Sequence, residues 1–186
     1  MGHSVKERVI AGARRAIEDV GWQAATLEQI ASAAGLSRMT LHRHGFGRDE
    51  IFALLAAAYE ADFHAFVERA CGRAGSPVVR LEAGLRAVCE ATERHLAFLA
   101  GLDDEADTRL FHDDGVSRPG YVSPIEEVLA AGVGDGSFTR VDVSRMAVLL
   151  VNAADRTYRH LRAAHGWSPD EAAEAIELLV GGLASR

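Results

Sequence analysis

The sequence is poor in several residue types, and each scarcity excludes a class of protein. Its two cysteines, Cys71 and Cys89, are too few for the disulfide framework of a small secreted domain. Only four prolines interrupt stretches in which alanine alternates with charged residues, which favours helices over sheet. No run of about 18 apolar residues occurs, so no membrane-spanning helix is predicted. The first residues lack the apolar core and cleavage site of a secretory signal, and we expect a cytoplasmic protein with reduced thiols.

Lysine is scarcer still, with one residue against nineteen arginines, and the charges are unevenly distributed along the chain. The formal net charge is −7. Residues 1–48 carry seven basic and four acidic side chains, a balance of +3, whereas residues 49–186 carry 13 basic and 23 acidic side chains, a balance of −10. A basic first segment before an acidic remainder is typical of a protein that meets a polyanion at one end only.

The apolar periodicity predicts an all-α fold of about nine helices, with no strand alternation and no internal repeat. Capping residues and glycines mark where the helices begin and end. The predicted helices cover residues 5–20, 27–34, 38–44, 48–71, 78–101, 124–133, 144–165 and 169–184. The polar stretch 101–120 is expected to be a loop or to hold one short helix.

A helix-turn-helix spacing lies in the basic segment, around the stretch GLSRMTLHRHGFGRDE at residues 35–50. Gly35 supplies the positive φ that a tight bend requires, and Ser37 is placed to cap the following helix. Ala31, four residues before Gly35, is small where that helix approaches, and Leu41, six residues after it, fixes the helix from inside. Any αα-hairpin also shows this spacing, so by itself it leaves DNA binding and a structural hairpin both open.

The longer stretch GWQAATLEQIASAAGLSRMTLHRHGFGRDEIF resembles the N-terminal signature of the TetR family of bacterial transcriptional regulators. The resemblance covers about residues 9–52 and rests on Gly21, Thr26, Leu27, Ile30, Ala31, Ala34, Gly35, Leu36, Ser37, Thr40, Leu41, His44 and Ile51. It implies a three-helix DNA-binding domain over residues 1–48 and a larger helical effector-binding and dimerisation domain over residues 49–186. The candidate DNA contacts are Thr26, Ser37, Arg38, Met39, Thr40, His42, Arg43, His44 and Arg48.

The sequence departs from the family pattern at three places. His42 stands where the family usually has tyrosine, and Arg48 replaces a lysine. Gly45 occupies the place of a phenylalanine, and Phe46 follows one position late. We predict that Gly45 ends the second helix of the motif in a Schellman turn and that Phe46 packs back onto it. The changes at His42 and Gly45 also leave open a helical adaptor that has lost DNA binding.

The resemblance further implies a homodimer that binds a palindromic operator, with repression as the family default, and releases the DNA when a small molecule enters the second domain. The last two helices of such proteins usually pair with those of the partner, here through Met146, Leu149, Leu150, Ala153, Leu161, Ala172, Ile176, Leu179, Val180 and Leu183. The candidate effector-pocket residues are His95, Phe98, Phe111, His112, Tyr121, Asn152 and Tyr158. A role in the internal core, or at the surface, is the alternative for both sets.

A metal-dependent enzyme is the remaining alternative. Its ligands would come from the HDD run at residues 112–114 or from His160 and His165. These two histidines are five residues apart, so they are not expected to share one helix face as an i, i+4 pair would. No catalytic triad order, phosphate-binding loop or CxxC motif is present. We therefore expect no enzymatic activity, no cofactor and no metal, and as partners double-stranded operator DNA, a second copy of the chain and a small-molecule effector, but no membrane.

Overall fold

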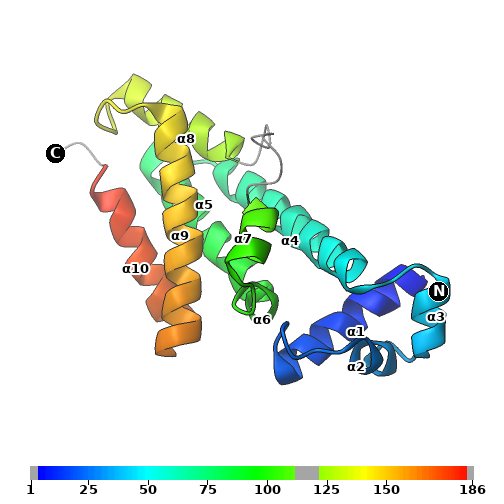
Figure 1. The fold of residues 1–186 in the computed structure, drawn as a ribbon. Helices are drawn as coiled ribbons and strands as arrows, with labels where there is room; N and C mark the ends of the chain where they lie inside the picture. Colours follow the sequence, from blue (N-terminus) through cyan, green and yellow to red (C-terminus); the bar gives the residue numbers. More distant parts are fainter. Residues whose placement is uncertain (1–3, 112–121, 184–186) are drawn as a thin grey trace. The chain divides into compact units, whose positions relative to one another are not determined.

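A computed structural model describes residues 4–111 and 122–183 (Figure 1). The fold is all-α, as predicted, and the described part holds ten helices where the sequence predicted about nine. In chain order they are α1 (Val5–Val20), α2 (Leu27–Ala33), α3 (Arg38–Arg43), α4 (Arg48–Cys71), α5 (Pro77–Arg94), α6 (Leu96–Leu99), α7 (Asp104–Phe111), α8 (Ser123–Asp135), α9 (Val143–His165) and α10 (Pro169–Gly181).

The described chain divides into two compact units. The first comprises residues 4–60 and 97–111, and the second comprises residues 61–96 and 122–183. Helix α4 contributes to both units. The predicted domain boundary at residue 48 coincides with the start of α4, and the assignment of separate functions to the two sides of that residue stays a prediction.

In the first unit, α1 packs against α2, and α2 contacts α3. The buried face of α1 carries Val9, Ala13 and Ile17, at the three- and four-residue spacing of an amphipathic helix. Gly12 lies where α1 meets the end of α2: a Cβ atom added there would come within 2.6 Å of the backbone nitrogen of Ala34. The close packing of these two helices therefore requires a residue without a side chain.

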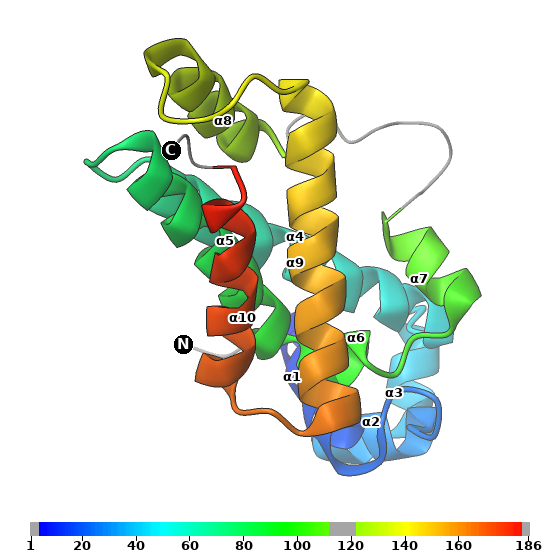
Figure 2. The same ribbon diagram turned by 90° about the vertical axis from the view of Figure 1, so that its left-hand side faces the viewer.

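In the second unit, α5 is the central helix and packs against α8, α9 and α10. Helices α9 and α10 lie side by side along it (Figure 2). The apolar core of this unit is formed by side chains from all four helices, among them Leu81, Leu85, Val88, Ile125, Leu129, Leu150, Val151, Ala172 and Ile176. This arrangement leaves one side of α9 and α10 uncovered by other described helices of the unit, where Leu149 and Leu178 are exposed.

One predicted helix is divided in two. The sequence predicted a continuous helix over 78–101, but α5 ends at Arg94 and α6 begins at Leu96. The interruption is at His95, whose φ of −119° is not helical. The His95 ring is buried, and its Nε2 atom lies 2.8 Å from a carboxylate oxygen of Asp62. The periodicity missed the break because this contact joins residues 33 positions apart.

Candidate nucleic-acid interface

Helices α2 and α3 both end in the same kind of tight turn, which has a glycine with positive φ. At the end of α2, Gly35 has a φ of 66°, and its amide donates to the Ser32 carbonyl at 2.9 Å. The amide of Leu36 donates to the Ala31 carbonyl at 2.8 Å. These two hydrogen bonds define a Schellman motif. Because its positive φ favours glycine, Gly35 sets the direction in which the chain leaves for α3.

The end of α3 repeats this geometry and confirms the turn predicted from the sequence. Gly45 has a φ of 73°, and its amide donates to the His42 carbonyl at 3.0 Å. The amide of Phe46 donates to the Leu41 carbonyl, also at 3.0 Å. The Phe46 ring stacks with that of His44, with 6.5 Å between ring centres. The aromatic residue displaced by one position in the sequence thus packs beside the end of the same short helix.

Helix α3 presents nearly all of its side chains to solvent. Ser37 caps it by accepting a 3.0 Å hydrogen bond from the amide of Thr40. Leu41 is 1% exposed and holds the helix to the core of the unit, whereas Met39 is 77% exposed. Of the predicted DNA contacts, the exposed ones are Thr26, Ser37, Arg38, Met39, His42, Arg43, His44 and Arg48, and Thr40 is half-buried. No acidic residue lies on α3, so its outer surface, here called the α3 surface, is basic and polar around one apolar side chain.

Part of the basic charge of the first segment serves the fold. Arg8 of α1 donates from Nε to the Ala34 carbonyl at 3.2 Å and from Nη2 to the Gly35 carbonyl at 2.6 Å. Arg15 donates to the Ala33 carbonyl. These arginines satisfy carbonyls that the end of α2 leaves open, and their charge complements the negative end of the helix dipole. The charge asymmetry of the sequence therefore overstates the number of side chains left for a polyanion.

Arg48 also has an internal role. Its guanidinium lies 4.1 Å from the centre of the Trp22 ring, a cation–π distance. Nη1 donates to the Ala25 carbonyl at 2.8 Å, and Nη2 donates to the Trp22 carbonyl at 2.5 Å. The planar fork, which a lysine does not have, joins the first turn of α4 to the loop between α1 and α2. The sequence predicted Arg48 only as a DNA contact and missed this function.

The predicted effector-pocket residues that the structure describes fall in both units. Phe98 lies in the first unit, where its ring contacts those of Trp22 and Phe52, each at 5.5 Å between centres. In the second unit, the buried His95 ring contacts the carboxylate of Asp62. The half-buried Asn152 donates to a carbonyl of its own helix, four residues earlier. The side chain of Phe111, together with His112 and Tyr121, lies outside the described residues.

Tyr158, also predicted for the pocket, belongs to a polar network between α5 and α9. Its buried hydroxyl donates to Glu93 at 3.0 Å. Arg162 donates to both oxygens of the same carboxylate, at 2.8 Å from Nε and 2.6 Å from Nη2. The Arg162 hydrogen bond is the main cause that lowers the pKa of Glu93, and burial raises the pKa of Tyr158. The polar ends of these side chains are thus engaged with one another.

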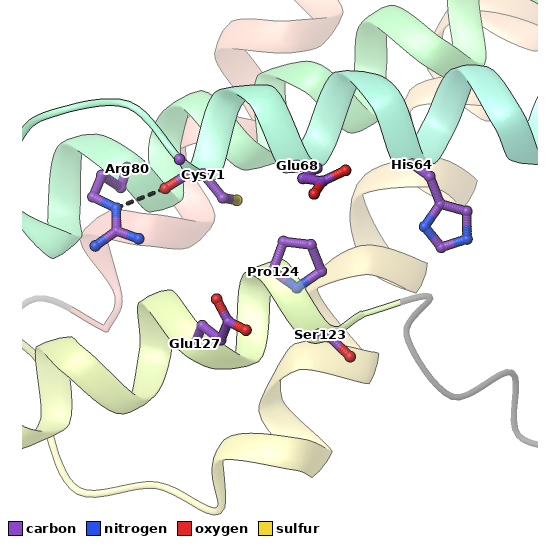
Figure 3. A pocket seen from close by; sticks show the side chains of 8 residues that line it. His64, Glu68, Cys71, Arg80, Ser123, Pro124 and Glu127 are labelled. Carbon is purple, nitrogen blue, oxygen red and sulfur yellow. Dashed lines mark hydrogen bonds between the residues drawn. The ribbon is translucent and has the colours of Figure 1, made fainter.

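A cavity of about 500 Å³ lies elsewhere in the second unit, between the last turns of α4 and the starts of α5 and α8 (Figure 3). Its lining residues are His64, Glu68, Cys71, Gly72, Arg80, Ser123, Pro124 and Glu127. Nε of Arg80 donates to the Cys71 carbonyl at 2.7 Å, so two of the lining residues are bonded to each other. Burial raises the pKa of the Cys71 thiol to about 11, which makes the thiol unreactive. Of the predicted pocket residues whose side chains the structure describes, His95, Phe98, Asn152 and Tyr158, none is among the residues that line this cavity.

The predicted dimer residues of α9 and α10 fall into two groups. Leu150, Ala172, Ile176, Val180 and Leu183 are buried within the unit. On α9, Leu149 is 59% exposed, while Met146, Ala153 and Leu161 are half-buried. Leu178 of α10, which was not predicted, is 78% exposed. The side chain of Leu179 lies outside the described part of the chain. Apolar side chains of α9 and α10 therefore remain uncovered, or partly so, in the single chain. We call them the α9/α10 strip: Met146, Leu149, Ala153, Leu161 and Leu178.

The described residues give little support to a metal cluster, a reactive cysteine or a membrane-spanning helix. No group of three or more His, Cys, Asp or Glu side chains there is arranged to hold a metal ion. Both cysteines are free and buried, and burial raises the pKa of Cys89 to about 12. Across the described ranges, none of the helices has the length and apolar character needed to cross a membrane.

The geometry defines a class of protein: a helix-turn-helix domain with an exposed basic second helix, followed by a helical domain. Residues 9–55 match the family model described as bacterial regulatory proteins, tetR family. Residues 9–55 accordingly form a domain of the TetR family of transcriptional regulators, and proteins of this family bind DNA. No curated protein sequence matches it.

Solved structures of the same fold cover the whole chain. The TetR-family regulator PfmR from Thermus thermophilus is 22% identical, with 96% of this chain and 100% of that chain covered and a TM-score of 0.72. A tetR-family regulatory protein from Rhodococcus RHA1 is 16% identical over the full length of both chains, with a TM-score of 0.74. The fatty acid degradation regulator FadR from Bacillus halodurans is 17% identical, also over both full lengths, with a TM-score of 0.72. At these identities the similarity defines the fold alone.

Proposed function

We propose that this protein is a ligand-responsive repressor that binds a palindromic operator as a homodimer through α3. The observation that carries the proposal is the α3 surface. It is basic, free of carboxylates and held rigid at both ends, by Ser37 at its start and Gly45 at its end. A short helix of this kind fits the major groove, where arginine, histidine and hydroxyl side chains reach phosphates and base edges.

The proposed DNA contacts differ in the chemical groups that they offer to the DNA. Arg38 and Arg43 supply positive charge at the two ends of α3, and His42 and His44 supply ring nitrogens that can form hydrogen bonds. Thr26 and Ser37 sit at helix starts, next to amides that favour a phosphate. Arg48 is left out of the contact set because its guanidinium is held by Trp22 and two carbonyls.

The test is DNA binding at several salt concentrations, with a fragment from upstream of the protein's own gene. Affinity is expected to fall with a log–log slope of about −0.9 for each phosphate neutralised. Arg38→Ala and Thr40→Ala are expected to weaken binding by about 1–3 kcal/mol for the arginine and less for the threonine. Arg73→Ala, an exposed arginine after α4, is the matched control and should bind like the parent. Absence of salt-sensitive binding to any promoter fragment would favour the adaptor.

The homodimer is proposed from the α9/α10 strip. Leu149, Ala153 and Arg156 follow one another at i, i+4 and i+7, so they lie along one face of α9. An apolar strip rimmed by charge on a monomer marks a protein interface. Sedimentation equilibrium is expected to give twice the chain mass of 19.9 kDa, for the parent and for Arg38→Ala alike. A monomer would contradict this part of the proposal and leave the DNA test unaffected.

The effector is proposed to bind in the cavity between α4, α5 and α8. The cavity lies in the size range of small-molecule sites and offers both charged and apolar groups. A compound that releases the DNA would be found by screening. Ser123→Trp, which fills the cavity, is then expected to abolish release without weakening DNA binding. Ala130→Trp, on an exposed part of α8, should still respond. An unchanged response of Ser123→Trp would place the effector elsewhere.

A further inference from the structure

Two histidines meet at the end of α9. The Nε2 atoms of His160 and His165 are 3.1 Å apart, and both residues are exposed. Five residues of separation place the two histidines on different faces of a regular helix, as the sequence predicted, yet their side chains meet. That separation is about 140° and about 7.5 Å on a regular helix, but His165 is the last residue of α9, and the two long side chains bridge the distance.

The arrangement of the two rings suits a shared ion better than a mutual hydrogen bond. Their centres are 4.7 Å apart, with an angle of 81° between the planes. A linear N–H···N bond of the observed length would separate the centres by about 5.4 Å. Two rings directed at one ion, each with its nitrogen about 2.05 Å from it and with an angle of about 98° at the ion, would separate the nitrogens by about 3.1 Å and the centres by about 4.8 Å. Both observed distances match the second arrangement.

The surroundings favour a cation. Ala163 and Ala164, on the turn between the two histidines, are exposed and too small to cover the rings. The pair lies at the C-terminal end of a 23-residue helix, where the helix dipole places partial negative charge. The nearest cationic side chain along the last turn, Arg162, is held away by both oxygens of Glu93.

We propose that His160 and His165 form a chelating site for a divalent transition-metal ion at the end of α9, with water in the remaining coordination positions. Imidazole nitrogen suits Zn²⁺, Ni²⁺ and Cu²⁺, whereas Mg²⁺ and Ca²⁺ prefer oxygen. With two protein ligands and no third one from the described residues, the affinity should follow the order of intrinsic metal affinities, with Cu²⁺ bound most tightly. The bound ion would link the last turn of α9 and stabilise it.

The test is calorimetric titration of the full-length protein with Ni²⁺, Zn²⁺ and Mg²⁺. A site for Ni²⁺ and Zn²⁺ is expected, weakened on the order of tenfold or more by His160→Gln and by His165→Gln alike. His44→Gln, at an exposed histidine directly after α3, is the control and should bind metal as the parent does. Equal affinity in both α9 variants and the parent, loss in only one of them, or an equal response to Mg²⁺ would overturn the proposal. Because both side chains are exposed, circular dichroism should show that all three variants fold.

Discussion

Replacing Gly12 by alanine is expected to destabilise the first unit and to remove DNA binding, although alanine is the better helix former. The new Cβ would lie 2.6 Å from the backbone nitrogen and 2.8 Å from the Cα atom of Ala34. These atoms belong to the end of α2, which Arg8 and Arg15 also hold, so they cannot rotate away as a flexible side chain would. Overpacking of this kind costs about 1–3 kcal/mol, more than the gain in helix propensity.

Gly12→Ala is expected to lose DNA binding because of where the displaced residue, Ala34, lies in the motif. Ala34 directly precedes Gly35, so a displacement of Ala34 changes the turn from which α3 starts. Gly134→Ala is the control, because a Cβ at this glycine of α8 meets nothing within 4 Å and should stabilise the helix by up to about 1 kcal/mol. Urea unfolding of the two variants should move in opposite directions, and only Gly12→Ala should lose DNA binding. A Gly12→Ala protein as stable as the parent would show that α1 and α2 do not pack this closely.

The parts of the fold that the sequence predicted are those decided by near neighbours. Thr26, Ser37 and Ser168 each accept a hydrogen bond from an amide three residues later. The Schellman turn at Gly45 likewise involves atoms no more than five residues apart. A local pattern contains all the partners of such an interaction, so it could be interpreted correctly even where the sequence leaves its family's pattern.

Long-range partners were not predictable in this way. Arg48 counted as a basic residue beside the motif, and nothing local indicates that its guanidinium lies over Trp22, 26 positions earlier. Tyr158 had the apolar body and polar tip of a ligand-binding residue, but Glu93 on α5 accepts its hydrogen bond. The sequence shows which side chains are able to line a cavity, whereas the packing of α5 against α9 decides which partner the Tyr158 hydroxyl contacts.

The same limit applies to the α9/α10 strip. Periodicity marks an apolar residue as facing a neighbour, but it does not separate a neighbour in the same chain from one in a second copy. Ile176 and Leu149 were predicted alike, and the structure buries the first while leaving the second exposed. The exposed members of the set are thus the ones on which the proposed dimer depends.

Removing the carboxylate of Asp155 is expected to be the most destabilising single change in the second unit. Asp155 is buried in α9, accepts a 2.9 Å hydrogen bond from the Thr92 hydroxyl of α5, and pairs with Arg159 at 3.0 Å. The side chain of Arg159 is only 12% exposed. Asp155→Ala would leave this guanidinium buried without its carboxylate, at a cost of about 3–5 kcal/mol. Asp155→Asn, which keeps an acceptor for Thr92, should cost less.

Urea unfolding at one fixed protein concentration would measure these differences, because a dimer's stability depends on concentration. Asp142→Ala, at the start of the same helix, is the matched control: Asp142 is an exposed N-cap whose loss costs about 1 kcal/mol. The double change Asp155→Leu with Arg159→Met should recover part of the loss, since it removes both charges together. If Asp155→Ala cost no more than Asp142→Ala, the pair would have to be accessible to water, and α5 and α9 would not enclose it.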